Sequence, residues 1–224
     1  GEKVRLFTYL AVKEDAIGLS ETGTDIIAAG SGCVDNNMAA YTQSLDGTNS
    51  ACTFYFDRFY AAINWCNTAI FHAQTVPNPS NDEILATTLN KREAEARVLR
   101  TFYYWILTET FGDTYYTDQP STSIVMNPVK TSTDNIYQYM FDDLDWAIKS
   151  KLSTLQNDGG RVTIWTAKAL KARLLLTRAC EKNDVDMYGQ AYDLAKDVIE
   201  NGPFELAEDF ASIWDMKNSD GNSN

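Results

Sequence analysis

The sequence has few of the residues from which most catalytic and metal sites are built. Its 224 residues include one histidine, four cysteines and no C-x-x-C pair, which argues against a zinc knuckle or a thioredoxin-type redox site. Basic residues are also scarce, since 19 Lys and Arg face 31 Asp and Glu and give a formal net charge of −12 at pH 7. Such a charge repels phosphate backbones and anionic headgroups, so we expect no nucleic acid and no direct membrane-surface partner.

Long apolar runs are missing as well. No stretch approaches the ~20 apolar residues that a membrane-spanning helix needs, and the start Gly1-Glu2-Lys3 shows no signal peptide. Five prolines and twelve glycines are too few for a fibrous or largely disordered chain. With 44% apolar and 22% charged residues, the composition is that of one globular domain, or at most two. We expect a single helical domain over residues 1–224.

The four cysteines divide into two groups. Cys66 and Cys180 fall on apolar helical faces, so we predict small core residues there. Cys33 and Cys52 flank a polar loop and could form a disulfide if the protein is exported.

Hydrophobic periodicity predicts five helices and no long strand, so the fold class is mainly α. Ser132 begins a capping cluster. Gly112-Asp113 and Asn201-Gly202-Pro203 are predicted helix ends, with Gly202 in the left-handed conformation. The predicted helices cover residues from about 54 to 74, 83 to 110, 132 to 148, 163 to 180 and 186 to 201.

A weak internal repeat suggests how the helices pack. The tetrapeptide at 96–99, Ala-Arg-Val-Leu, recurs at 172–175 as Ala-Arg-Leu-Leu. Each copy lies on a long helix that follows a shorter amphipathic one. This arrangement predicts tetratricopeptide-like stacked helix pairs with long intervening loops.

Two long loops are predicted, at about 23–53 and about 112–130. Loops of this length within a compact domain are more often functional than filler. Asn64 and Asn67 lie on an otherwise apolar helix. We predict that these asparagines tie their helix to a neighbouring loop, with ligand contact as the alternative.

Candidate catalytic groups are sparse. His72 lies near the end of a predicted helix, where a solvent-facing or capping role is expected. Carboxylates cluster at 93/95 and at 142/143/145, but neighbours one or two apart on a helix point in different directions. We therefore predict solvated faces there, although distant carboxylates could still converge in the fold. No catalytic residue, metal ligand or cofactor is predicted.

Several segments, in the right order, resemble the SusD/RagB family of bacterial nutrient-binding lipoproteins. The most specific is Glu93–Tyr104, with its alanine-glutamate-alanine-arginine run, followed by Thr110-Phe111-Gly112-Asp113. Other matching segments are 60–70, 136–148, 160–174 and 188–206. A tryptophan common in the family near Phe54 or Tyr55 is absent here. Family members are usually about twice as long, so the resemblance implies the N-terminal portion of a longer architecture.

The resemblance implies a function without catalysis. Members of the family capture glycans, and sometimes peptides, on the outer face of the outer membrane. They cover a SusC-type TonB-dependent transporter. It implies a glycan ligand, a SusC-type partner and surface exposure at the outer membrane. Membrane attachment would be through a lipid anchor on a cysteine preceding Gly1.

The resemblance also suggests where a ligand would bind. Family ligands usually meet the loop before the first matching helix, here residues 25 to 55, together with loops from the C-terminal half. The expected contacts are carboxylate and amide groups that bond hydroxyls and rings that stack on sugars. They are Asp25, Asn36, Asn37, Tyr41, Asn49 and Tyr55. The alternative is a loop packed over the helices by its own side chains.

Two other functions fit the sequence. One is a helical-repeat scaffold whose concave face binds a protein or peptide; its exposed aromatics would lie along a helical groove rather than on the loops. The other is a helical glycan-processing enzyme with two acids about 5–10 Å apart across a cleft.

Overall fold

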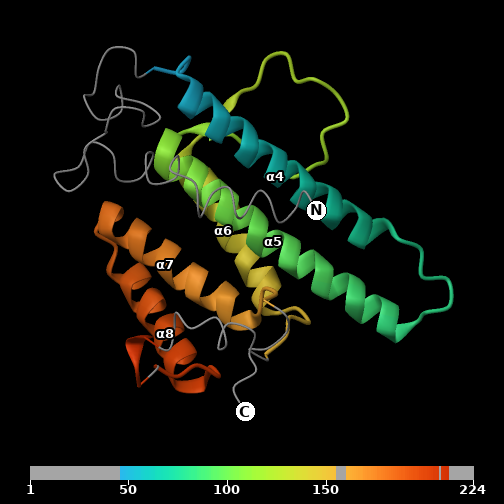
Figure 1. Ribbon diagram of the computed structural model, residues 1–224, viewed down its shortest axis with the longest axis vertical. Coiled ribbons are helices and arrows are strands. Elements are labelled where there is room, and N and C mark those ends of the chain that lie inside the picture. Colours follow the sequence, from blue (N-terminus) through green and yellow to red (C-terminus); the bar gives the residue numbers. More distant parts are fainter. Residues whose placement is uncertain (1–45, 155–159, 207, 212–224) are drawn as a thin grey trace. The chain divides into compact units, whose positions relative to one another are not determined.

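The computed structural model describes residues 46–154, 160–206 and 208–211, and this part of the chain is mainly α-helical (Figure 1). The mainly α prediction is confirmed. Each predicted helix is present, and the predicted limits agree with the observed ones within a few residues. The helices are α4 (Ser50–Thr75), α5 (Glu83–Phe111), α6 (Thr133–Ile148), α7 (Ile164–Lys182) and α8 (Val185–Asn201).

The chain divides into two compact units, residues 1–62 and 63–224. The division falls within α4, so the second half of this helix belongs to the unit that contains α5 to α8. The helical stack described below is that second unit. The prediction of one domain over the whole chain stays a prediction.

Side-chain caps set where the helices begin. Asp82 accepts hydrogen bonds from Ile84 N and Leu85 N at the start of α5, and Ser132 accepts one from Asn135 N at the start of α6. Thr163 and Thr166 form a capping box at the start of α7. These contacts satisfy main-chain donors that the first helical turn leaves without a partner.

The helix ends correct one prediction. Gly112, after α5, has a positive φ of 69° with a ψ of −136°, which lies outside the left-handed helical region and which glycine adopts at little cost. Gly202 has a φ of −75° instead, so its predicted left-handed conformation is wrong. A glycine is required there for another reason, because a Cβ would overlap the main-chain oxygen of Val198. The left-handed end belongs to Asn183 after α7, with a φ of 53°.

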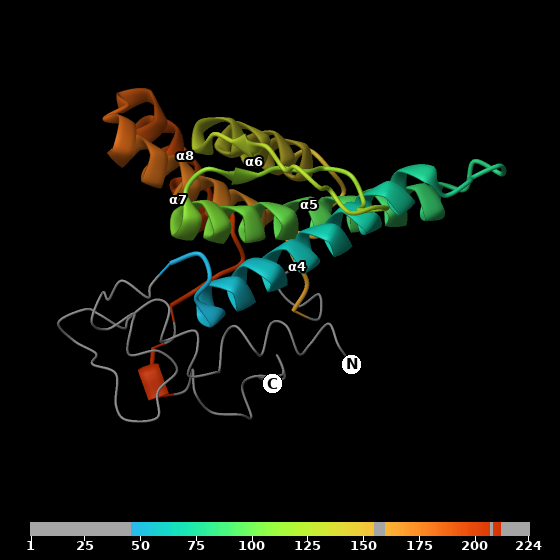
Figure 2. The same ribbon diagram turned by 90° about the horizontal axis from the view of Figure 1, so that it is seen from above.

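Consecutive helices pack side by side in the order α5, α6, α7 and α8, which confirms the stacked helix pairs (Figures 1 and 2). Alanines at 167, 172 and 179 of α7 are buried, and small side chains there allow neighbouring helices to approach closely. Cys66 is buried as predicted, but Cys180 is exposed, so its predicted core position is wrong. The fully buried large side chains of this unit include Ile63, Tyr104, Leu107, Ile136, Tyr137, Met140, Leu144 and Leu174.

The predicted long loop between α5 and α6 is closed at its base. Strands β1 (Thr114–Tyr115) and β2 (Lys130–Thr131) pair antiparallel, with Thr114 opposite Thr131. Residues 116–129, which we call the closed loop, therefore leave and return at one place. Across the described residues, no helix combines the length and apolar character needed to cross a membrane.

Candidate functional site

The closed loop is held against α4 by two asparagines. Asn67 is fully buried, and its Nδ2 donates to Thr117 O at 3.0 Å and to Gln119 O at 3.1 Å. Ser121 N donates to Asn64 Oδ1 at 2.7 Å. These contacts confirm the prediction that the asparagines tie their helix to a neighbouring loop.

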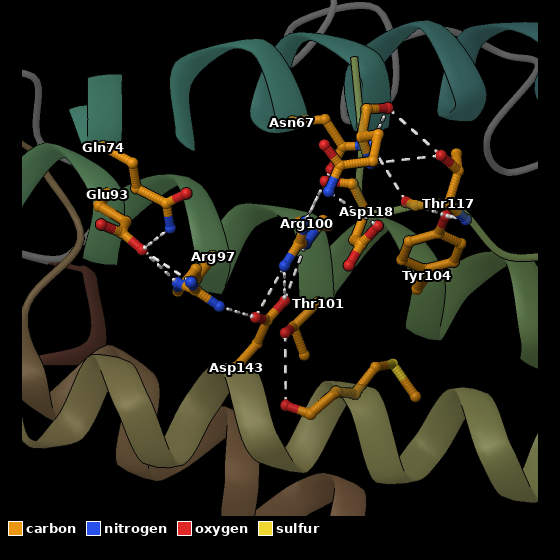
Figure 3. Close-up of polar contacts among 12 residues, drawn as sticks. Asn67, Gln74, Glu93, Arg97, Arg100, Thr101, Tyr104, Thr117, Asp118 and Asp143 are labelled. Atoms are coloured by element: carbon orange, nitrogen blue, oxygen red, sulfur yellow. Dashed lines mark hydrogen bonds and ion pairs between the residues drawn. The ribbon is translucent and has the colours of Figure 1, made fainter. Parts of the chain in front are cut away.

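Helix α5 holds the same segment of the loop. Tyr104 donates its hydroxyl to Thr117 O at 2.9 Å and accepts from Thr117 N at 2.8 Å. Arg100 Nη1 lies 3.4 Å from Asp118 O (Figure 3). Every one of these bonds from α4 and α5 ends on a main-chain atom of the loop, so they fix its path without using the side chains of residues 117–121.

A buried arginine–aspartate pair connects this anchor to α6. Arg100 Nε and Nη2 donate to the two carboxylate oxygens of Asp143, each at 2.8 Å. Nη1 of the same guanidinium donates to Asn67 Oδ1 at 2.8 Å. Arg100 therefore links α4 to α6 (Figure 3). Burial alone would lower the pKa of Arg100, but its hydrogen bonds to Asp143 and the charge of that carboxylate raise it.

A second arginine extends the pair into a network. Arg97 Nη1 donates to Asp143 Oδ1 at 2.6 Å, and its Nε donates to Glu93 Oε1 at 2.9 Å. Gln74 Nε2 reaches the same Glu93 oxygen at 2.8 Å. The polar network thus runs from the buried Asn67 and the exposed Gln74 on α4, through α5, to Asp143 on α6 (Figure 3).

Buried carboxylates overturn the prediction of solvated acidic faces. Glu93, Glu95 and Asp143 are each less than a tenth exposed, whereas Asp142 is exposed as predicted. The acids are buried because arginines neutralise them. Arg92 and Arg161 both bind Glu95. Burial raises the pKa of Glu95, but hydrogen bonds from Arg161 and then Arg92 outweigh this effect and lower it. These acids serve as ion-pair partners of arginines.

Three tyrosines form a stack where the closed loop crosses α5 and α6. Tyr116 lies between Tyr104 and Tyr139, with ring centroids 4.9 Å and 4.3 Å away and planes inclined by 33° and 25°. Tyr104 is buried, and Tyr139 is 41% exposed. Burial raises the pKa of the Tyr116 hydroxyl, although nearby Arg100 opposes the rise. Sequence reasoning missed Tyr139; an aromatic on the polar face of a predicted helix was the available signal.

The six predicted ligand residues fall in two groups. Asp25, Asn36, Asn37 and Tyr41 lie outside the described residues. Asn49 is buried, and its side chain accepts from Cys52 N at 3.4 Å at the start of α4. Tyr55 is also buried, and its ring contacts Phe54 and Phe59. The ligand roles of all six stay predictions, and so does the Cys33–Cys52 disulfide, because Cys33 lies outside the described residues.

Metal-binding clusters are absent from the described ranges, where no group of three or more His, Cys, Asp or Glu side chains could hold an ion. His72 is exposed in the last turn of α4, as predicted.

Residues 19–223 match the model of a family described as "Starch-binding associating with outer membrane". The chain belongs to the SusD-like family. This family is described by what it binds and not by a reaction, in agreement with the prediction of a non-catalytic protein. The residues that carried the resemblance in the sequence, from Tyr60 to Leu206, all lie within the matched range.

SusD-like relatives are longer than this chain. A SusD-like protein of Bacteroides ovatus is 29% identical over 167 residues, which are 72% of this chain and 30% of that protein. The starch-binding protein SusD of Bacteroides thetaiotaomicron is 27% identical over 139 residues, or 62% of this chain and 24% of that protein. The chain therefore corresponds to about a third or less of these relatives.

Solved structures share the fold. A SusD superfamily protein of Parabacteroides distasonis superposes with a TM-score of 0.69 at 24% identity, over 79% of this chain and 37% of that one. A surface glycan-binding protein A of Bacteroides fluxus gives a TM-score of 0.66 at 23% identity, over 82% and 37%. These likenesses confirm the helical SusD-like fold.

Proposed function

We propose that this protein captures an oligo- or polysaccharide at the bacterial cell surface, without cleaving it, and passes it to a SusC-type TonB-dependent transporter. The observation that carries the proposal is family membership, because the match extends over residues 19–223 and the family is described as starch-binding. The description also associates the family with the outer membrane, which is where the proposed capture takes place.

The relatives' names support a glycan as the ligand class. One relative is named as the starch-binding protein SusD. Among the structures with the same fold, one is named a surface glycan-binding protein and another a laminarin-binding SusD-like protein. These names report two different polysaccharides, so the ligand of this chain has to be found by experiment.

The proposed contacts are the six residues between Asp25 and Tyr55. Asp25 and the amides at 36, 37 and 49 would bond sugar hydroxyls, and the rings at 41 and 55 would stack on sugar faces. Asn49 and Tyr55 are buried at the start of α4, so a ligand contact there would add to their packing role.

Affinity gel electrophoresis tests the proposal. The chain, and a version extended in its natural reading frame, are run through gels that contain starch, laminarin or xylan. We expect one polysaccharide to retard the protein and Tyr41→Ala to abolish the retardation. Tyr55→Phe, which keeps the buried ring, isolates the contribution of the hydroxyl. Tyr192→Ala is the control, because Tyr192 is exposed on α8 and belongs to no proposed contact.

Two other results of the electrophoresis would change the proposal. Retardation of the extended version alone would place the binding site in the residues that follow Asn224. If neither version is retarded by any of the three polysaccharides, glycan capture is wrong, and a peptide ligand or a helical-repeat scaffold becomes the better explanation.

A further inference from the structure

Tyr139 is an exposed aromatic residue on a rigid support. One face of its ring lies on Tyr116 at a centroid distance of 4.3 Å, and the residue is 41% exposed. Tyr116 is in turn held between Tyr139 and the buried Tyr104. The exposed ring therefore has little freedom to lose when a ligand covers it, and binding costs less conformational entropy.

Exposed polar residues share the helix face of Tyr139. Asn135 and Asp142 lie four residues before and three residues after Tyr139 on α6, so they share its face of the helix, and both are exposed. Gln138 Nε2 donates to Asp142 Oδ1 at 2.9 Å, which orients that carboxylate. From the closed loop, Asp118 lies close enough to Tyr116 to raise the pKa of its hydroxyl, after the larger effects of burial, Arg100 and Asp143.

This combination fits a sugar ring. The negative face of an aromatic ring attracts the C–H face of a pyranose, while carboxylates and amides accept or donate hydrogen bonds to the ring's hydroxyls. The charged groups named at the surface, Asp118 and Asp142, are both acidic, and the arginines below them are engaged by buried carboxylates. An anionic sugar would meet like charge there, so the chemistry favours a neutral one.

We propose that Tyr139, supported by Tyr116 and flanked by Asn135, Asp142 and Asp118, is a stacking site for a neutral sugar of the captured glycan. The proposal rests on the proposed function. None of the five residues belongs to the set predicted between Asp25 and Tyr55, so the site is a second contact point for the same polymer.

Dissociation constants from affinity electrophoresis over a range of starch, laminarin and xylan concentrations test this site. Tyr139→Ala removes the ring, and we expect the dissociation constant for the retarding polysaccharide to rise about fivefold, as loss of one aromatic contact predicts. Tyr139→Phe keeps the stacking face and should stay within about twofold of the wild type. Tyr192→Ala, an exposed tyrosine on α8, is the matched control and should change nothing.

Tyr139→Leu separates a loss of stacking from a loss of folding. Leucine still covers Tyr116 but offers no aromatic face, so it should weaken binding as alanine does while the urea midpoint stays near the wild-type value. If the wild type is retarded and Tyr139→Ala and Tyr139→Leu bind as well as it does, the stacking site is wrong and glycan capture stands. If only the extended version is retarded, the stacking site is wrong and glycan capture stands; if neither version is retarded by any of the three polysaccharides, both proposals fail.

Discussion

Arg100 is a charged residue in a place that water does not reach, since only 3% of its surface is exposed. Burying a guanidinium costs several kcal/mol unless a partner carries the opposite charge. Asp143 supplies that charge through two hydrogen bonds, and Asn67 accepts a third. Arginine suits this position better than lysine, because its planar group makes all three contacts at once.

Replacing Asp143 tests this reasoning. Asp143→Asn leaves Arg100 and Arg97 without their shared negative partner, so the free energy of unfolding should fall by about 3 kcal/mol. Asp142→Asn, one residue away and exposed, should change it by less than about 0.5 kcal/mol. Urea unfolding followed by circular dichroism measures both. Equal losses in the two variants would show that the buried pair does not stabilise the fold.

Glu95 gives the molecule a defined sensitivity to acid. Its pKa is lower in the folded protein than in the unfolded chain, where it is about 4.3. The stabilisation that ionised Glu95 contributes is therefore complete above the unfolded-state pKa and is lost as the pH falls through the folded-state pKa. Glu95→Gln should cost about 2 kcal/mol at pH 7. The difference in the free energy of unfolding between this variant and the wild type should shrink below about pH 4. Urea titrations across this range test it, and a gap that stays constant on acidification would contradict the assignment.

At the scale of elements, the closed loop depends on α4 and α5. The side chain of Asn67 donates to two main-chain carbonyl oxygens of the closed loop and accepts a hydrogen bond from Arg100. Asn67 has no exposed surface. Asn67→Ala removes these bonds and leaves buried polar partners unpaired, at a cost of about 2–3 kcal/mol. The closed loop, whose residues 121–129 are all exposed, should then be cut faster by thermolysin, with fragments identified by mass spectrometry.

A matched control distinguishes release of the closed loop from destabilisation of the whole fold. Asn90 also anchors a loop through a main-chain atom, since its Oδ1 accepts from Lys151 N at 2.8 Å. Asn90→Ala should leave cleavage within 116–129 at the wild-type rate. Faster cleavage there in both variants would mean that the loop opens with the whole fold rather than through its own anchor.

Elements differed in how well the sequence predicted them, and distance along the chain explains why. Helix limits depend on periodicity and on caps such as Ser132, which are local, and the role of Asn67 follows from one polar residue on an apolar face. The buried carboxylates were predicted wrongly because their partners are remote. Arg97 and Asp143 are separated by 46 residues, and Glu95 and Arg161 by 66. The tyrosine stack likewise needs three separate elements, which no periodicity reveals.

At the scale of the whole chain, the net charge of −12 bears on which glycan the proposed site would accept. Such a charge would repel acidic polysaccharides and leave neutral ones unaffected. We expect the dissociation constant for a neutral polysaccharide to be the same at about 20 mM and about 300 mM NaCl, where screening differs strongly. Affinity electrophoresis at both salt concentrations measures this. A strong salt dependence would indicate a charged ligand and contradict stacking on a neutral sugar.

The manner in which the closed loop is anchored bears on how such a protein can change over evolutionary time. Thr117, Asp118, Gln119 and Ser121 are held from α4 and α5 through their peptide groups, and a peptide group is the same whatever side chain follows it. Substitutions at 118, 119 and 122–129 can therefore accumulate without rebuilding the support beneath them. New ligand preferences could arise there by point mutation, and a library randomised at these positions should yield mostly folded proteins.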